Sequence, residues 1–262
     1  MFKSFNVSIE NDDFDKYLAF GQELHKKNKR IVSNTLENFK GDDDKLIASK
    51  IVGEWFPEFK ADVFLSHSHK DETSVIALSG WLSKEFGLTS FVDSCIWGYS
   101  EKLLKMIDDQ YCYDDEKIFY NYYKRNRSTS HVYMMLSTAL SRMIDGCEAV
   151  FFVNTPNSFS ADKYIEAQGT TESPWIYSEL AMTRLVRKKT PEEHRSFHMI
   201  GEARDSMESH KELNIEYGAD LSHLIPLSKE DLDSWVLQNS DTGSRSLNTL
   251  YRNKGISTWT RK

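Results

Sequence analysis

The sequence is poor in the residues that would place it in several protein classes. Its 262 residues include only three cysteines, Cys95, Cys112 and Cys147. An odd number of widely spaced cysteines provides no disulfide framework and is typical of a chain that folds in a reducing compartment. No apolar run approaches the roughly 18 residues that a membrane-spanning helix needs, and the first residues lack the apolar core of a signal peptide. We therefore expect a cytoplasmic protein without a membrane partner.

The sequence also lacks an excess of positive charge. Its 33 basic residues face 40 acidic ones, which gives a net charge of −7. This balance argues against nucleic acid as a main partner. Hydrophobic residues make up 39% of the chain and aromatic residues 13%, which is enough for a sizeable core. We expect one large domain with additions, and we find no internal repeat or low-complexity tract.

The first 60 residues have helical character. Apolar residues stand out from a polar background at Phe14, Leu18, Phe20 and Leu24. A second helical stretch at 45–52 follows an acidic break at 41–44 and is stopped by Trp-Phe-Pro at 55–57. These features predict an N-terminal helical extension over residues 1–60.

A strand, a helix and a second strand follow. Residues 61–66 are apolar and rich in β-forming residues, which indicates a buried strand. Residues 71–86 carry a helical stripe of apolar positions that Gly87 closes as the residue after the helix end. Residues 89–93 predict the next strand. A βαβ unit of this length predicts a parallel sheet with a right-handed crossover.

Residues 95–130 are less regular and rich in tyrosine. They are interpreted either as a surface insertion with partly buried tyrosines or as a lid or self-association surface. A helix is then predicted over 131–144, and a third strand over 149–153. Further strands are predicted at 196–200 and at 223–227, the latter at a sheet edge because of Pro226.

Ser228 caps a predicted helix over 229–238, with Asp231 completing a capping arrangement. Residues 240–262 hold five Lys or Arg against one Asp. This basic tail is interpreted either as mobile or as docking onto an acidic neighbour.

The segment 173–180 combines a helix start with an aromatic ring and a carboxylate. Ser173 is the expected N-cap and Pro174 stands at the first helical position, where its missing N–H costs nothing. Trp175 and Glu179 are four residues apart, so they share one face of the helix. In an open α/β sheet such a helix start lies near the crevice where ligands bind. A flat ring beside a carboxylate suits a ligand that is both aromatic and cationic.

Four motifs of this sequence resemble Toll/interleukin-1 receptor (TIR) domains. Asp-Val-Phe-Leu-Ser-His-Ser-His-Lys-Asp at 62–71 is similar to the first strand and loop of that family, and Phe-Val-Asp at 91–93 to its second strand. Asn-Thr-Pro-Asn-Ser at 154–158 resembles the exit of the third strand, and 173–180 resembles the Ser-x-Trp-x-x-x-Glu-Leu helix. Ile176 stands where the family has Cys, so no thiol chemistry is carried over.

The resemblance implies a flavodoxin-like doubly wound parallel sheet of about five strands over residues 61–239. The extension at 1–60 and the insertion at 95–130 look like bacterial TIR proteins, and those of Thoeris anti-phage defence systems are the nearest comparison. The insertion is longer than the loop of animal and plant TIR domains.

Enzymatic TIR domains cleave NAD⁺ between nicotinamide and ribose, and the resemblance implies this reaction here, with NAD⁺ as substrate and no further cofactor. In the bacterial proteins the product is a cyclic ADP-ribose isomer or an ADP-ribose conjugate that activates a separately encoded effector. The expected partners are therefore NAD⁺ and such an effector, and assembly into a homo-oligomer is left open.

The resemblance makes Glu179 the candidate catalytic residue, which would bind the ribose hydroxyls and stabilise oxocarbenium character. Trp175 would stack on nicotinamide or adenine, a contact worth about 0.5–2 kcal/mol. The candidate substrate-binding residues are Ser66, His67, Ser68, Asp71, Asp93, Asn154 and Trp175. The simpler alternatives are a solvated carboxylate for Glu179 and a core residue for Trp175. The histidines at 67 and 69 lack a clear partner motif, so no metal site is expected.

Two other functions compete with an NAD⁺-cleaving enzyme. One is a TIR scaffold that only associates with other TIR domains, although a scaffold does not require a carboxylate at residue 179. The other is an enzyme similar to nucleoside deoxyribosyltransferases, which share the architecture and a glutamate.

Overall fold

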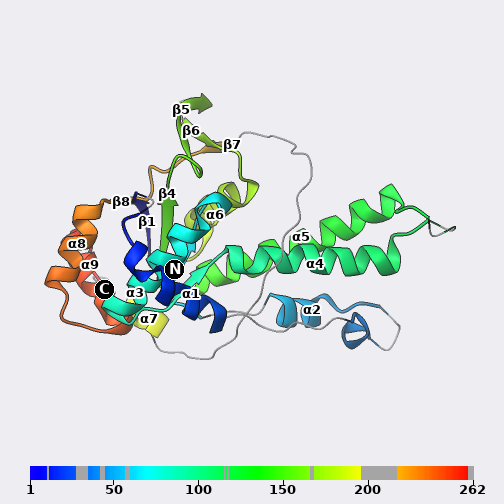
Figure 1. Cartoon of the computed structure of the whole chain (residues 1–262), viewed down its shortest axis with the longest axis horizontal. Helices are drawn as coiled ribbons and strands as arrows, with labels where there is room; N and C mark the ends of the chain where they lie inside the picture. Colours follow the sequence, from blue (N-terminus) through cyan, green and yellow to red (C-terminus); the bar gives the residue numbers. More distant parts are fainter. Residues whose placement is uncertain are drawn as a thin grey trace.

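A computed structural model of the chain shows a five-stranded, entirely parallel sheet flanked by helices (Figure 1). The strands are β1 (Lys3–Ser8), β2 (Val63–Ser66), β3 (Ser90–Val92), β4 (Ala149–Asn154) and β8 (Ile225–Leu227), in the spatial order β3-β2-β4-β1-β8. The structure describes residues 1–10, 12–27, 35–41, 45–56, 60–114, 116, 118–165, 168–195 and 217–258, without the side chains of 95–98 and 161–168. The predicted parallel α/β sheet is confirmed.

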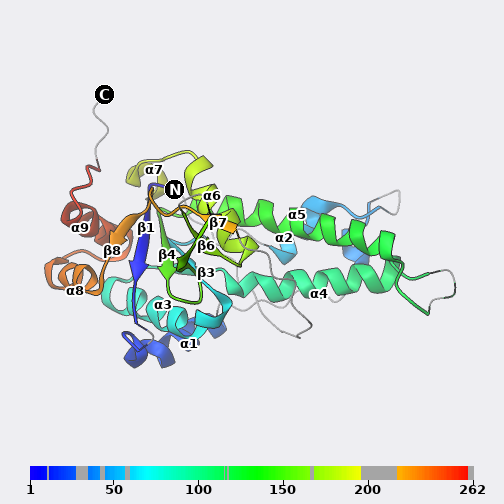
Figure 2. The same ribbon diagram turned by 90° about the horizontal axis from the view of Figure 1, so that it is seen from above.

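Helices cover both faces of this sheet, which is the doubly wound arrangement (Figure 2). On one face lie α1 (Leu18–Lys27) and α3 (Glu72–Phe86), with α8 (Lys229–Gln238) and α9 (Ser246–Asn253) near β8. Gly21 of α1 faces Ile76, and an added Cβ there would lie 2.1 Å from the Ile76 carbonyl oxygen, so only glycine permits this close approach. On the other face lie α2 (Ala48–Trp55), α4 (Ser94–Tyr111), α5 (Tyr122–Gly146) and α6 (Pro174–Leu185).

The two faces have separate hydrophobic cores because side chains alternate along each strand. Val63 and Leu65 of β2 pack with Trp81 of α3, whereas Phe64 between them packs on the opposite side. Burial of β2 and β4 on both faces explains their nearly continuous apolar sequences.

The N-terminus is not purely helical, and this corrects the prediction for residues 1–60. β1 runs parallel to β4 and β8 in the middle of the sheet, with Lys3 opposite Ala149 and Phe5 opposite Ile225. Phe5 and Val7 are fully buried and alternate with polar residues, which is the two-residue period of a strand.

Numbered in chain order, the five strands have the spatial order 3-2-4-1-5. The arrangement resembles the flavodoxin-like order 2-1-3-4-5 if β2, β3 and β4 are taken as its first three strands, and the N-terminal β1 then occupies the place of the fourth strand. The fourth strand predicted at 196–200 lies outside the described residues. The predicted edge strand is confirmed as β8, where Pro226 pairs opposite Asn6.

The region predicted to be irregular, 95–130, is mostly helical. α4 occupies its first half and α5 begins at Tyr122, nine residues earlier than the predicted helix. The two helices pack against each other as a hairpin that projects from the body of the molecule (Figure 1). Asp108 accepts a hydrogen bond from Arg125 Nε at 2.9 Å and so ties α4 to α5.

Two further segments complete the described fold. A small antiparallel sheet of β5 (Ser160–Ile165), β6 (Gln168–Thr171) and β7 (Tyr217–Ala219) follows β4, and α7 (Pro191–Arg195) is a short helix. The tail predicted to be mobile or docked on an acidic neighbour instead contains α9, whose Leu247, Leu250 and Tyr251 are buried in the core. None of the helices in the described ranges is both long and apolar enough to cross a membrane.

Local predictions of helix ends are confirmed. Gly87 adopts φ 66° after α3, the left-handed conformation that favours glycine. Ser228 and Asp231 form the complete capping box of α8. Both signals depend only on residues that are close in sequence.

Candidate functional site

Three predicted residues meet at the carboxyl edge of the sheet. Ser66 ends β2, Asp93 follows β3, and Asn154 ends β4. The chain places β3 on one side of β2 and β4 on the other. This reversal is a topological switch point, where ligands bind in open α/β sheets.

Helix α6 brings Glu179 to the same edge. The Ser173 hydroxyl accepts a hydrogen bond from the backbone N–H of Ile176 at 3.3 Å, and Pro174 opens the helix, as the sequence predicts. Ile176 and Leu180 are buried against Phe152 of β4, which fixes the rotation of the helix. Glu179 consequently points inward and is only 2% exposed.

The carboxyl group of Glu179 is held by Ser66. The Ser66 hydroxyl donates to Glu179 Oε2 at 2.6 Å, and both side chains are buried. The other oxygen, Oε1, is buried and has no hydrogen-bond partner among the described residues. A buried acceptor without a partner is costly and is a recurrent feature of functional sites.

His67 and Asp93 form a second buried pair beside Glu179. His67 Nδ1 lies 2.5 Å from Asp93 Oδ1, and both side chains are fully buried. The Asp93 carboxylate interacts with the imidazole through both charge and hydrogen bonding. Neither residue was expected to be so enclosed.

The pKa values of this cluster are shifted. Burial, reinforced by the nearby Asp93 carboxylate, raises the pKa of Glu179 well above the usual carboxyl range, and the hydrogen bond from Ser66 only partly opposes this. Burial alone would lower the pKa of His67, but the Asp93 carboxylate outweighs it and raises that pKa. The closed site therefore favours a neutral Glu179 next to an imidazolium–carboxylate pair.

Asp71 joins two loops instead of facing the cluster. Its carboxylate accepts hydrogen bonds from the Thr155 hydroxyl at 2.5 Å and from Asn157 Nδ2 at 2.7 Å. The loop after β2 is thereby tied to the loop after β4. Asp71 thus has a clear structural role at the site.

The remaining predicted residues are half-buried around the cluster. Ser68 accepts the backbone N–H of Asp71 with its carbonyl oxygen, and Asn154 lies at the end of β4 opposite Ser8. Trp175 packs against the core that contains α5, with its ring centroid 5.6 Å from that of Tyr133. Helical spacing places Trp175 on the side of Glu179, but its ring contacts α5.

Sequence reasoning missed the residues that support this site. Ser94 donates to Glu72 at 2.9 Å, which links the start of α4 to the start of α3. Thr155 and Asn157 were considered only as part of the motif at 154–158, and Tyr133 only as part of the helix predicted over 131–144. The available signal for Thr155 and Asn157 was that their polar side chains closely follow the strand predicted over 149–153.

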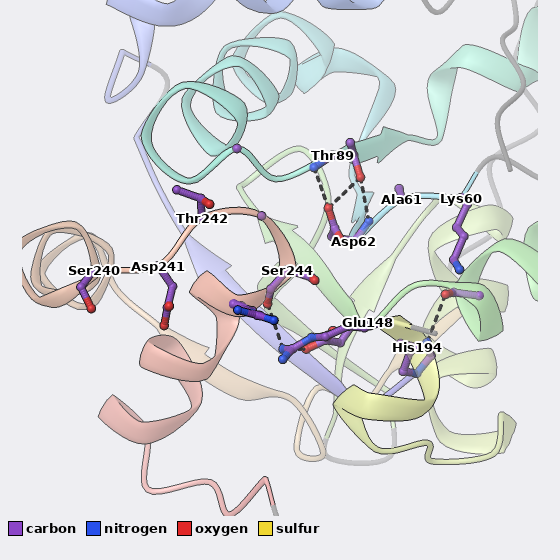
Figure 3. Close-up of a pocket in the computed structure, with 15 residues that line it drawn as sticks. Lys60, Ala61, Asp62, Thr89, Glu148, His194, Ser240, Asp241, Thr242 and Ser244 are labelled. Carbon is purple, nitrogen blue, oxygen red and sulfur yellow. Dashed lines mark hydrogen bonds and ion pairs between the residues drawn. The ribbon is translucent and has the colours of Figure 1, made fainter. Parts of the chain in front are cut away.

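A large cavity lies at the opposite, amino end of the sheet (Figure 3). It has a volume of about 840 Å³ and is lined by residues that precede β2, β3 and β4, by α7 and by the loop 240–245. Asp62 accepts hydrogen bonds from Thr89, and Glu148 pairs with Arg195 at 2.7 Å. Because these carboxylates are already paired, we place the candidate site at the carboxyl edge instead.

The described side chains contain no group of three or more histidine, cysteine or acidic residues arranged to hold a metal ion. The fold and the buried cluster define an α/β protein of flavodoxin-like architecture with a polar site at its switch point. Searches of protein-family models, curated proteins and solved structures gave no match to this chain.

Proposed function

We propose that the protein is a TIR-domain enzyme that cleaves NAD⁺ at the bond between nicotinamide and ribose. The observation that carries the proposal is the buried Glu179 carboxyl, held by Ser66 from β2 at the switch point of the sheet. The motifs around residues 62–71 and 173–180 resemble those of TIR domains, and they supply the two sides of this contact.

The chemistry requires one carboxylate and no general acid. The C1′–nitrogen bond breaks, its electron pair leaves with nicotinamide, and the cationic ring becomes neutral. Positive charge then develops on the ribose, which an ionised Glu179 stabilises. Water or an internal nucleophile then attacks C1′, and its proton passes to the ionised Glu179.

The closed cluster must open for this reaction. Glu179 is 2% exposed and Asp93 and His67 are 0% exposed, so NAD⁺ reaches the carboxyl only after a rearrangement. A cationic nicotinamide ring beside Glu179 lowers its pKa and favours the ionised form. The structure is therefore interpreted as a resting state in which the carboxyl is kept neutral.

In the proposed pathway the product is an ADP-ribose derivative, cyclic or conjugated, that activates a separately encoded effector in anti-phage defence. The support for this step is the resemblance to bacterial TIR proteins of Thoeris systems. The product class would be assigned by mass spectrometry of the reaction mixture.

The test is incubation of the purified protein with NAD⁺ and chromatographic measurement of released nicotinamide. Release that is lost in Glu179→Gln, and retained in Glu172→Gln on the exposed turn before α6, supports the enzyme. Absence of turnover in all conditions, including phage lysate and high protein concentration, contradicts it and favours a scaffold. Base exchange between deoxynucleosides would instead indicate a deoxyribosyltransferase-like enzyme.

A further inference from the structure

The buried cluster at the carboxyl edge of the sheet encloses two carboxyl groups beside one imidazole. Ser66 and His67 are consecutive residues at the end of β2. The first donates to Glu179 at 2.6 Å, and the second lies 2.5 Å from Asp93. All four side chains are buried. The two carboxyl groups therefore share one small space that water does not reach.

The charges of this cluster are balanced in only one protonation state. The His67 imidazolium and the Asp93 carboxylate cancel each other, which leaves a neutral Glu179. If Glu179 ionises, two carboxylates face one cation and an excess negative charge is buried. An unpaired buried charge is costly, so the closed arrangement favours the neutral carboxyl.

Other charged groups around α6 do not correct the imbalance. Glu72 of α3 acts on His67 and is itself a carboxylate. At the far end of α6, Arg184 pairs with Asp220, and its Nε donates to His223 Nδ1 at 3.0 Å. The Arg184 cation is therefore already neutralised by a carboxylate of its own.

The titratable residues that α5 and β7 place against α6 are tyrosines. Tyr133 of α5 contacts Trp175, and Tyr217 of β7 stacks on Tyr177. Neither contact supplies a cation to the cluster. The protonation of Glu179 thus depends mainly on its burial and on Asp93.

Helix α6 is attached to the sheet by two kinds of contact. Ile176 and Leu180 pack against Phe152 of β4, and these apolar contacts do not depend on pH. The hydrogen bond from Ser66 to Glu179 links the helix to β2, and it involves a group that can ionise. A single proton can therefore decide whether the start of α6 stays on the sheet.

We propose that this cluster is a one-proton latch, which holds the first two turns of α6 on the sheet edge while Glu179 is neutral and releases them when it ionises. The His67–Asp93 pair stays in place, because its residues lie at the ends of the neighbouring strands β2 and β3. Release exposes Glu179 to water, which hydrates its charge. The latch controls access to the site and in that role rests on the proposed function.

The pKa of Glu179 fixes the direction of the response. Burial and the Asp93 carboxylate raise this pKa in the closed protein, and release returns it towards the ordinary glutamate value of about 4.3. The closed form is therefore favoured at low pH, and the opening constant rises about tenfold per pH unit between the two pKa values. Burial lowers the pKa of His223, which has the opposite sign and favours closure as pH rises.

A thiol placed on the buried face of α6 measures the opening. The labelling rate of Ile176→Cys, divided by the rate in the unfolded protein at the same pH, gives the opening constant. Cys147 is fully buried and reports global unfolding in the same peptide mass spectra. From about pH 5 upwards we expect labelling at residue 176 to rise about tenfold per pH unit, with Cys147 unchanged. Leu180→Cys is a second reporter on the same face and should respond alike.

Three further changes in the reporter protein test the assignment to Glu179. Glu179→Gln keeps an acceptor for Ser66 and cannot ionise, so its labelling ratio should not change with pH. Asp93→Asn removes the second carboxylate, and the rise should end at least about one pH unit lower. Asp233→Asn on α8, where the side chain is 59% exposed, is the matched control and should respond as the reporter protein does.

A labelling ratio that is independent of pH in both reporters overturns the latch. So does a rise that persists in Glu179→Gln, because another group then controls the opening. Parallel labelling of Cys147 also overturns it, since the whole fold then opens. These measurements use no NAD⁺, so a working latch without nicotinamide release would contradict only the proposed function.

Discussion

The two ends of the central sheet each bury a glutamate, and the two environments are opposite. Glu148 before β4 and Glu179 on α6 are both 2% exposed. Glu148 accepts hydrogen bonds from the Arg195 guanidinium at 2.7 and 2.9 Å and from the Tyr251 hydroxyl at 3.1 Å. Glu179 has one hydroxyl donor, Ser66, and lies beside another carboxylate, Asp93.

This difference separates a structural carboxylate from a functional one. Burial raises the pKa of Glu148, but the Arg195 cation opposes the shift. At Glu179 the neighbouring charge acts in the same direction as burial. A paired buried charge fixes the geometry of a fold. A buried carboxyl beside another carboxylate is instead kept neutral, and binding of a cationic ligand lowers the free-energy cost of ionising it.

The largest effect on stability is expected from removing the buried Glu148–Arg195 ion pair. Glu148→Ala leaves the Arg195 guanidinium without its buried carboxylate and should lower the free energy of unfolding by about 3–5 kcal/mol. Thermal denaturation followed by circular dichroism measures the change. The Glu148→Gln variant, which keeps an acceptor for Tyr251, should lose less. If Glu148→Ala were as stable as the wild type, Glu148 would have no structural role.

At the carboxyl edge of the sheet, replacing Glu179 should change the free energy of unfolding less than replacing Glu148 does, but it should change activity more. Glu179→Gln should reduce nicotinamide release by at least about 100-fold, because the neutral amide cannot stabilise positive charge on the ribose. The variant should remain folded, since an amide still accepts from Ser66. Steady-state kinetics beside a melting curve measure both quantities. Full activity in this variant would rule out Glu179 as the catalytic group.

The next effect concerns the aromatic neighbour. Trp175→Ala should raise KM for NAD⁺ by roughly 2- to 30-fold, the equivalent of the 0.5–2 kcal/mol expected for a cation–π contact. If the ring only packs against Tyr133, the same change alters the melting temperature and leaves KM unchanged. Trp175→Phe, which keeps a ring, separates the two contributions.

The smallest effect is a change in the pH dependence of stability. The pKa of Glu179 is raised in the folded protein, so the unfolded chain releases this proton at lower pH. Stability from this group is present at low pH and is lost as pH rises through the folded pKa. The raised pKa of His67 has an effect in the same direction. The stability from its charged form is present below the ordinary histidine pKa and is lost as pH rises through the folded pKa. The melting temperature of Glu179→Gln relative to wild type should therefore increase from pH 5 to pH 8, with Glu172→Gln as control, whereas a constant difference would contradict the shift.

The sequence predicts well what short-range signals determine. Ser173 and Pro174 define the start of α6, and Ser228 with Asp231 defines the start of α8, because caps involve residues three or four positions apart. The apolar runs of β2 and β4 are also local signals, because each lies within a few consecutive residues, and they predict buried parallel strands. These elements alone locate Ser66, Asp93 and Asn154 at one edge of the sheet.

The errors arise where distant partners decide the structure. β1 is short and half polar, and its burial depends on pairing with β4 and β8, far along the chain. In α4 the buried positions Tyr99, Leu103 and Ile107 repeat every four residues, a helical signal that the surrounding tyrosines and charges obscured. The pairing of His67 with Asp93 follows from strand order, which no local pattern encodes.

The position of β1 has a consequence for how the chain folds. Residue 3 pairs with residue 149 and residue 5 with residue 225, so β1 is synthesised well before either of its neighbours and cannot pair until they have been made. Pairing across such separations is slow because a long loop must close before any contact forms. Until then β1 is an unpaired strand with two open edges, which can join another chain. We therefore expect the N-terminal strand to limit the rate of folding and to be the segment most exposed to misassembly during synthesis.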